Sequence, residues 1–179
     1  LAPLLGGARA GTAEYSPDGS WVAWATNDGG PGRVWRSRPD GSQKTAVTDP
    51  DRLTVGPLAS LRWSPDARFL AFAAREAAKD PGPARMHLAD LDRGTVEPLS
   101  AEDRHVAQID PCWAADGRSV VYSTFFPPYA SEADTYLRRA DLATRRVEKL
   151  PGSEGLWAPK CARDGRVLAA DSAAQKART

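Results

Sequence analysis

Hydrophobic residues occur along this chain in short runs, separated by turns that contain Pro, Asp and Gly. Four of these runs are four residues long, at 21–24, 69–72, 119–122 and 167–170. The last residue of each run lies six positions after an aspartate, namely Asp18, Asp66, Asp116 and Asp164. Short apolar runs bounded by turn residues are typical of buried β-strands. We therefore expect an all-β chain built from many short strands.

The four aspartates mark a repeated unit. They lie 48, 50 and 48 residues apart, and a constant period of this length indicates a repeat fold. The units open with Tyr-Ser-Pro-Asp-Gly, Trp-Ser-Pro-Asp-Ala, Trp-Ala-Ala-Asp-Gly and Cys-Ala-Arg-Asp-Gly, which begin at positions 15, 63, 113 and 161. At such a turn Pro presets φ, Asp accepts backbone N–H groups and Gly adopts a positive φ. We expect one strand to end before each turn and the apolar run to follow it.

Two more strands are predicted in each unit. The third lies at 33–36, 85–88 and 135–138, and the fourth at 44–47, 95–99 and 147–150. Pro98 in the fourth strand has no N–H, which suits the edge of a sheet. Four-stranded antiparallel units at this period predict a β-propeller, with one unit per blade. We place the blades approximately at 11–57, 58–107, 108–156 and 157–179, the last one incomplete.

The number of blades leaves three alternatives open. About three and a half blades are present, whereas propellers typically have four to eight. The chain could be a fragment of a ring with six to eight blades. Two chains could instead complete one ring as a homodimer with closed symmetry. In the third alternative, residues 1–10 supply a missing strand to a four-bladed ring.

The repeated motif resembles that of a known family. Trp-Ser-Pro-Asp-Gly followed by an apolar strand is similar to the TolB-like, WD40-like (PD40) propeller repeat, and Leu-Arg-Trp-Ser-Pro-Asp at 61–66 matches it best. The segment 150–157 resembles one found in the sensor propellers of bacterial winged-helix regulators and receptor-like kinases. This resemblance implies a protein-interaction or ligand-sensing module of a bacterial envelope or signalling protein, in a periplasmic or extracytoplasmic location. The alternative it implies is the substrate-gating propeller of a prolyl-oligopeptidase-type serine hydrolase, whose catalytic domain would lie elsewhere.

Composition and charge exclude several classes of partner. The 179 residues include 24 Lys and Arg against 23 Asp and Glu, so the net charge is +1. A dedicated nucleic-acid binder usually has a clear basic excess, so we expect no bound nucleic acid. No run approaches 18 apolar residues, so we expect no membrane insertion. The basic residues near 138–149 are interpreted as guards of an edge strand.

Candidate catalytic and metal-binding chemistry is sparse. The chain has no Gly-x-Ser-x-Gly motif, and only two histidines. His87 is interpreted as a packing or surface residue of a strand, and His105 as a solvated loop residue. Asp90 and Asp92 lack the third oxygen ligand and the terminal Glu of a calcium loop. We therefore predict a protein that is not an enzyme and has no cofactor or metal.

Binding residues are expected on the loops between the second and third strands, because loops on a rigid scaffold carry most recognition. In the third unit this loop contains Phe125, Phe126 and Tyr129, which would form an exposed apolar patch for a protein or peptide partner. On the same face we predict polar contacts from Glu76, Asp80 and Arg104. The alternative is that Phe125 and Phe126 extend the strand and pack between blades.

The two cysteines fall on the first strands of neighbouring blades. Cys161 replaces the aromatic residue that Trp113 supplies in the third unit, whereas Cys112 lies one residue earlier in its own unit. Successive side chains on a strand point to opposite faces. From this alternation we expect two buried thiols and no disulfide.

Overall fold

The computed structural model describes residues 10–26, 31–56, 59–78, 82–100, 105–125 and 135–171, and every regular element in these ranges is a β-strand. The strands are β1 (Ala10–Tyr15), β2 (Val22–Thr26), β3 (Arg33–Ser37), β4 (Thr45–Ala46), β5 (Leu53–Thr54), β6 (Leu61–Trp63), β7 (Phe69–Glu76), β8 (Arg85–Asp90), β9 (Thr95–Pro98), β10 (Ala107–Trp113), β11 (Ser119–Phe125), β12 (Tyr136–Asp141), β13 (Val147–Lys149), β14 (Leu156–Cys161) and β15 (Val167–Asp171). Within these ranges no helix is long and apolar enough to cross a membrane.

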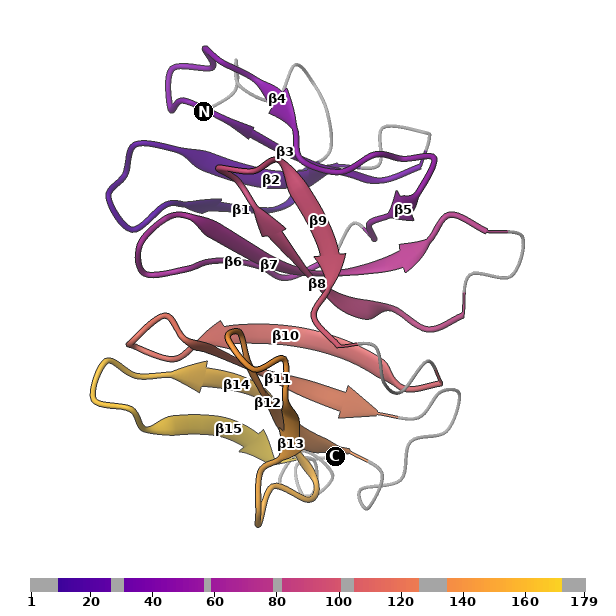
Figure 1. The fold of residues 1–179 in the computed structure, drawn as a ribbon, viewed down its shortest axis with the longest axis vertical. Helices are drawn as coiled ribbons and strands as arrows, with labels where there is room; N and C mark the ends of the chain where they lie inside the picture. Colours follow the sequence, from indigo (N-terminus) through magenta and orange to yellow (C-terminus); the bar gives the residue numbers. More distant parts are fainter. Residues whose placement is uncertain are drawn as a thin grey trace, which may run out of the picture.

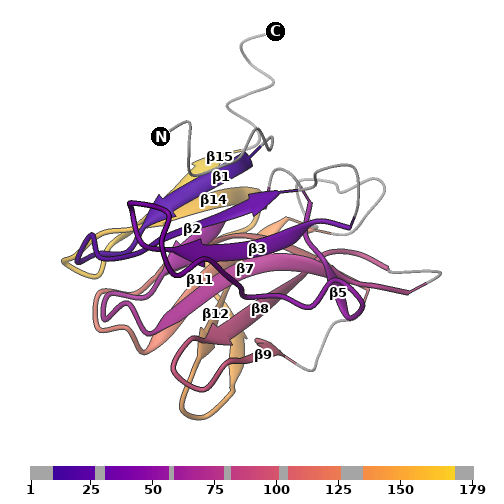
Figure 2. The ribbon, with the colours of Figure 1, turned by 90° about the horizontal axis from the view of Figure 1, so that it is seen from above.

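The strands form antiparallel sheets in chain order. Strands β1 to β4 make the first sheet, β6 to β9 the second and β10 to β13 the third, while β14 pairs with β15. The short β5 joins the second sheet by pairing with β7. Figure 1 shows the sheets following one another from β1–β4 to β14–β15, and Figure 2 shows the turns after β1, β10 and β14 gathered on one side. The prediction of a propeller built from four-stranded antiparallel blades is confirmed.

The first strand of each blade lies on the inner side of the array, where β1, β6, β10 and β14 contact one another from sheet to sheet. In the second and third blades, the aromatic residue at the end of this strand joins the blade to the preceding one. Trp63 Nε1 donates a hydrogen bond to Glu14 O at 3.0 Å, and Trp113 Nε1 donates to Arg62 O at 2.9 Å. Because both rings are also buried among apolar side chains, each fills the core between two blades.

The repeated aspartates have the turn role that the sequence predicts. Each accepts the backbone N–H of the residue two positions later, at 2.9–3.2 Å. Asp18 also accepts hydrogen bonds from the hydroxyls of Ser16 and Ser20, which lower its pKa to about 2. These contacts fix the loop between the first two strands of each blade, so the aspartates are architectural.

One of these turns carries a strained residue, which leads to a stability prediction. Ala67 has a φ of 59°, at the position where Gly19, Gly117 and Gly165 have φ values of 71°, 67° and 85°. Left-handed backbone costs an alanine about 1–2 kcal/mol, and the greater freedom of glycine in the unfolded chain offsets about half of that. We expect Ala67→Gly to raise the free energy of unfolding by about 0.5–1 kcal/mol in urea denaturation.

The reciprocal variant is the control for this prediction. A Cβ at Gly117 would approach the Pro65 ring at an ordinary 3.6 Å, so Gly117→Ala adds backbone strain without a steric clash. We expect it to destabilise the chain by about 1 kcal/mol. A loss of stability in Ala67→Gly would contradict the assignment of strain to this turn.

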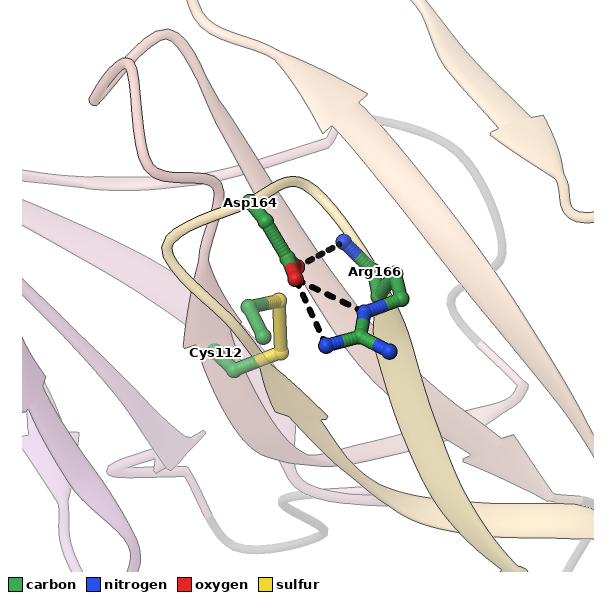
Figure 3. Close-up of a disulfide and its surroundings, with 4 residues drawn as sticks. Cys112, Asp164 and Arg166 are labelled. Carbon is green, nitrogen blue, oxygen red and sulfur yellow. Dashed lines mark hydrogen bonds and ion pairs between the residues drawn. A yellow bond between two sulfur atoms is a disulfide. The ribbon is translucent and has the colours of Figure 1, made fainter.

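The cysteines form a disulfide, so the expectation of two buried thiols is wrong. Cys112 in β10 and Cys161 in β14 are bonded, with their Cα atoms 5.6 Å apart (Figure 3). Cys161 stands at the position of Trp113, which points toward the preceding blade. Cys112 precedes Trp113 by one residue and therefore points toward the following blade. Where two blades pack together, the forward face of one blade meets the backward face of the next. The alternation of side chains, from which we expected no disulfide, therefore brings Cys112 and Cys161 together.

The last hairpin is one residue shorter than the others. Ala162 N donates to Arg166 O, four residues on, whereas Ala114 N donates to Ser119 O, five residues on. As a result Cys161 pairs with Val167, as Trp113 pairs with Val120, and the alignment of 167–170 with 119–122 shifts by one position. A shift of one residue exchanges the two faces of a strand. Leu168 consequently points away from the third blade and is 69% exposed.

Candidate functional site

Polar side chains on the inner strands connect the blades along the inner side. Arg62 Nη1 lies 3.6 Å from Glu14 Oε1, and Ser60 Oγ donates a hydrogen bond to Asp110 Oδ1 at 2.8 Å. Glu14 also accepts the backbone N–H of Trp63 at 3.3 Å. Burial raises the pKa of Glu14, and the positive charge of Arg62 partly opposes that effect. These groups are bonded to one another, so they act as structural links between blades.

A groove of about 420 Å³ lies between the first and second blades and includes Glu76, one of the predicted contacts. The two-residue β4 covers little of the second blade, and β5 pairs with the far end of β7, where Leu53 lies opposite Glu76. The apolar part of the lining is Val47, Leu53, Ala77, Ala78, Val96 and Pro98. Three charged side chains, Asp49, Arg52 and Glu76, also line it. The groove therefore combines apolar and charged side chains.

His87 also lines this groove and is the least exposed of its polar groups. Its ring stacks on Phe72, with the ring centroids 6.0 Å apart. Its Nδ1 lies 2.9 Å from the carbonyl oxygen of Arg85, which can only accept, so Nδ1 donates. Burial lowers the pKa of His87, so the neutral ring predominates at pH 7 and leaves Nε2 as a hydrogen-bond acceptor. His87 thus packs as predicted and also adds one acceptor to the groove.

A buried arginine holds the end of the groove at which Glu76 lies. Arg85 is 7% exposed and donates a hydrogen bond to Ser100 O. Its Nη1 also lies 3.9 Å from Glu76 Oε1. The Glu76 side chain is 58% exposed, so this ion pair positions its carboxylate without removing the carboxylate from solvent. A ligand in the groove can therefore reach Glu76.

Only two of the six predicted binding residues lie within the described part of the chain. Glu76 ends β7 and lines the groove. Phe125 ends β11, is half-buried, pairs with Ala107 and is not part of the groove lining. The other four, Phe126, Tyr129, Asp80 and Arg104, lie outside the described residues. The binding role of all six residues stays a prediction.

Sequence reasoning missed most of the groove. Asp49 lines the groove and also has a turn role, since its Oδ1 accepts the N–H of Asp51. Nothing in the local pattern shows that Arg52 of the first repeat unit lies beside Glu76 of the second. Asp90 has a turn role, since its Oδ1 accepts the N–H groups of Asp92 and Arg93. Within the described ranges no three His, Cys, Asp or Glu side chains are grouped to hold a metal ion.

Comparisons with known proteins identify the fold. No family model matches this chain. An uncharacterized protein of Agrobacterium fabrum is 30% identical over 119 residues, which are 64% of this chain and 39% of that protein. The structure of a putative TolB from Agrobacterium tumefaciens has a TM-score of 0.66 at 20% identity, covering 89% of this chain and 54% of that chain. The dipeptidyl peptidase 4 of Porphyromonas gingivalis has a TM-score of 0.65 at 14% identity, covering 88% of this chain and 29% of that chain.

A third structure, TolB from Acinetobacter baumannii, has a TM-score of 0.61 at 14% identity, covering 88% of this chain and 37% of that chain. The chain thus spans about half or less of the length of each of these four proteins. It has the β-propeller fold of TolB-like proteins, as the repeat motif predicts. The same fold occurs in propellers of TolB and of peptidases, so likeness of fold alone does not select between a binding module and part of an enzyme.

Proposed function

We propose that this chain belongs to a non-enzymatic recognition module that binds a protein or peptide partner in the groove between the first and second blades. The observation that carries the proposal is the exposed Glu76 carboxylate, held by Arg85 beside an apolar lining. Glu76, Asp49 and the neutral His87 all accept hydrogen bonds. A peptide that places a Lys or Arg side chain beside small apolar residues fits this combination.

The Cys112–Cys161 disulfide supports an extracytoplasmic location for the module. Disulfides persist in oxidising compartments such as the bacterial periplasm and are rare in the cytosol. The resemblance of the repeat motif to TolB-like propellers implies the same location. We therefore place the recognition step in the bacterial envelope, where the partner would be an envelope protein or a secreted peptide.

Peptide binding tests the proposal directly. Two labelled peptides of equal length and equal apolar content, one basic and one acidic, are titrated with the chain and followed by fluorescence anisotropy. We expect the basic peptide to bind saturably and the acidic one not to bind. Glu76→Gln removes the charge but keeps the shape, and should weaken binding about fivefold to tenfold, equivalent to about 1–1.4 kcal/mol.

Glu97→Gln is the matched control. The Glu97 side chain is 59% exposed, nearly the same as Glu76, but it forms an ion pair with Arg145 and does not line the groove. This variant should bind the basic peptide like the parent chain. Equal binding of both peptides, or equal losses in the two glutamine variants, would refute recognition at this groove.

The alternative function is a substrate-gating propeller of a prolyl-oligopeptidase-type hydrolase. Its support is the likeness of fold to the peptidase of Porphyromonas gingivalis described above. A fluorophosphonate probe applied to the full protein distinguishes the two functions, because only a serine hydrolase is labelled at its nucleophile. Labelling would replace the recognition proposal with the gating one.

A further inference from the structure

The outer edge of β15 differs from the outer edges of the second and third blades. The outermost strands β9 and β13 contain Glu97, Pro98, Glu148 and Lys149, and charges or proline at an edge oppose the addition of another strand. Residues 167–170 of β15 read Val-Leu-Ala-Ala, without charge or proline. The counterparts β2, β7 and β11 each have a strand on both sides, whereas β15 pairs with β14 alone within the described ranges. The composition of β15 is thus that of an interior strand.

The hydrogen-bonding direction of this edge follows from the hairpin register. Ala162 N donates to Arg166 O at 2.8 Å, and Val167 lies opposite Cys161. Directly opposed residues in an antiparallel pair alternate between bonded and non-bonded, so the N–H of Val167 points away from β14. The same alternation directs the N–H of Ala169 outward. Two donors on an apolar strand therefore face the open edge.

Two arginines at equivalent positions of the first and third blades show which hydrogen bond is missing next to the edge of β15. Arg36 pairs with Ala23 in the first blade, and its Nη2 donates to Leu91 O at 3.4 Å, in the turn between β8 and β9 of the following blade. Arg139 holds the same position in the third blade, where it pairs with Val121. The Nε atom of Arg139 is buried and, among the described residues, has no hydrogen-bond partner.

Arg139 lines a second groove, of about 340 Å³, between the third blade and β14–β15. Val121, Cys161, Val167 and Gly165 also line it, so it lies at the end of β15 that follows the turn. At the equivalent position between the first and second blades, the turn between β8 and β9 contacts the first blade through the hydrogen bond from Arg36 to Leu91 O. The disulfide between β10 and β14 holds both walls of this groove together.

We propose that β15 and this groove bind a two-stranded antiparallel β-hairpin of the same protein, which completes the fourth blade. Its first strand pairs with the outward N–H groups of Val167 and Ala169, and its turn offers a carbonyl oxygen to Arg139. In the three complete blades the third and fourth strands follow the second along the chain, so the same polypeptide is the source that the repeat supports. This proposal does not depend on the groove that contains Glu76.

A second copy of the chain fits this site less well. Two β15 strands could pair antiparallel across a two-fold axis, giving a four-stranded sheet. In that arrangement the start of the second β15, with its turn, would lie at the Asp171 end of the first. Arg139 lies near Gly165 and Val167, at the other end. Its guanidinium would then stay without the turn carbonyl that Arg36 has.

The test supplies a hairpin in trans to the 179-residue chain. The probe is a synthetic peptide of residues 85–98, the β8–β9 hairpin whose Leu91 carbonyl already accepts a hydrogen bond from Arg36. We expect saturable binding, with hydrogen exchange of the Val167 and Ala169 amides slowed at least tenfold. Arg139→Leu should weaken binding about fivefold, and the second blade carries Leu88 at this position, so the fold accepts leucine there.

Two further variants make the result decisive. Arg36→Leu changes the equivalent arginine in an occupied position, so peptide affinity should stay unchanged. Ala169→Pro removes one outward N–H while leaving the pairing with β14, and should abolish binding in a chain whose circular dichroism is unaltered. Saturating peptide without slower exchange at Val167 and Ala169 would overturn the proposal. So would slow exchange that appears without peptide, rises with protein concentration and accompanies a dimer in light scattering, because a second copy would then occupy the edge.

Discussion

Replacing Trp63 by Ala is expected to lower the free energy of unfolding by about 3–5 kcal/mol, the usual cost of deleting a large buried aromatic side chain. Trp63 is 6% exposed and packs in the cluster that joins the first and second blades. The variant also removes the hydrogen bond to Glu14 O. The cavity would lie between two sheets, where neighbouring backbone cannot easily collapse into it. Urea denaturation of the parent chain and the variant measures the difference.

Tyr15 provides the matched control, because it holds the same repeat position in the first blade but is 49% exposed. Tyr15→Ala should cost about 1 kcal/mol or less, since little apolar surface leaves contact. Trp63→Phe should fall between the two, because it keeps a ring but loses the N–H donor. If Trp63→Ala and Tyr15→Ala had equal costs, the assignment of Trp63 to the core between blades would be wrong.

Removing the disulfide is expected to cost about as much. Cys112 and Cys161 are 49 residues apart, and loop-closure entropy assigns a cross-link of this span about 4 kcal/mol. The double variant Cys112→Ala with Cys161→Ala should therefore unfold at a markedly lower urea concentration than the oxidised chain. Because the bond attaches β14 to β10, we expect amide exchange in β14 and β15 to increase most.

Two controls separate the cross-link from local packing. Dithiothreitol added to the parent chain should reproduce the stability of the double variant, because it opens the same bond without changing side-chain volume. Arg166→Ala removes an exposed ion pair with Asp164 close to the disulfide (Figure 3), and should leave the free energy of unfolding nearly unchanged, because exposed ion pairs contribute little to stability. A reduced chain as stable as the oxidised one would contradict a stabilising role for the bond.

The candidate site was only partly predictable because its residues come from separate blades. The position of Glu76 at the end of the second strand could be predicted from the repeat, and the loop after that strand is a usual position for binding residues. The contribution of Arg52 could not be predicted, because Arg52 belongs to the first repeat unit and the groove exists only where the two-residue β4 fails to cover the second blade. The length of such a short strand depends on the packing of the sheets, and the residues Thr45 and Ala46 do not predict that length.

The repeat, the strand order within each blade and the role of the aspartate turns follow from the amino-acid sequence alone. These features depend on local chemistry: turn residues fix the hairpins, and the alternation of apolar positions fixes the buried faces. The packing of one sheet on the next selects which faces meet. It brought Cys112 opposite Cys161, turned Leu168 outward through a shorter turn, and left Arg139 beside the open edge of β15. Each outcome depends on how one sheet stacks on the next, and a period along the chain does not carry that information.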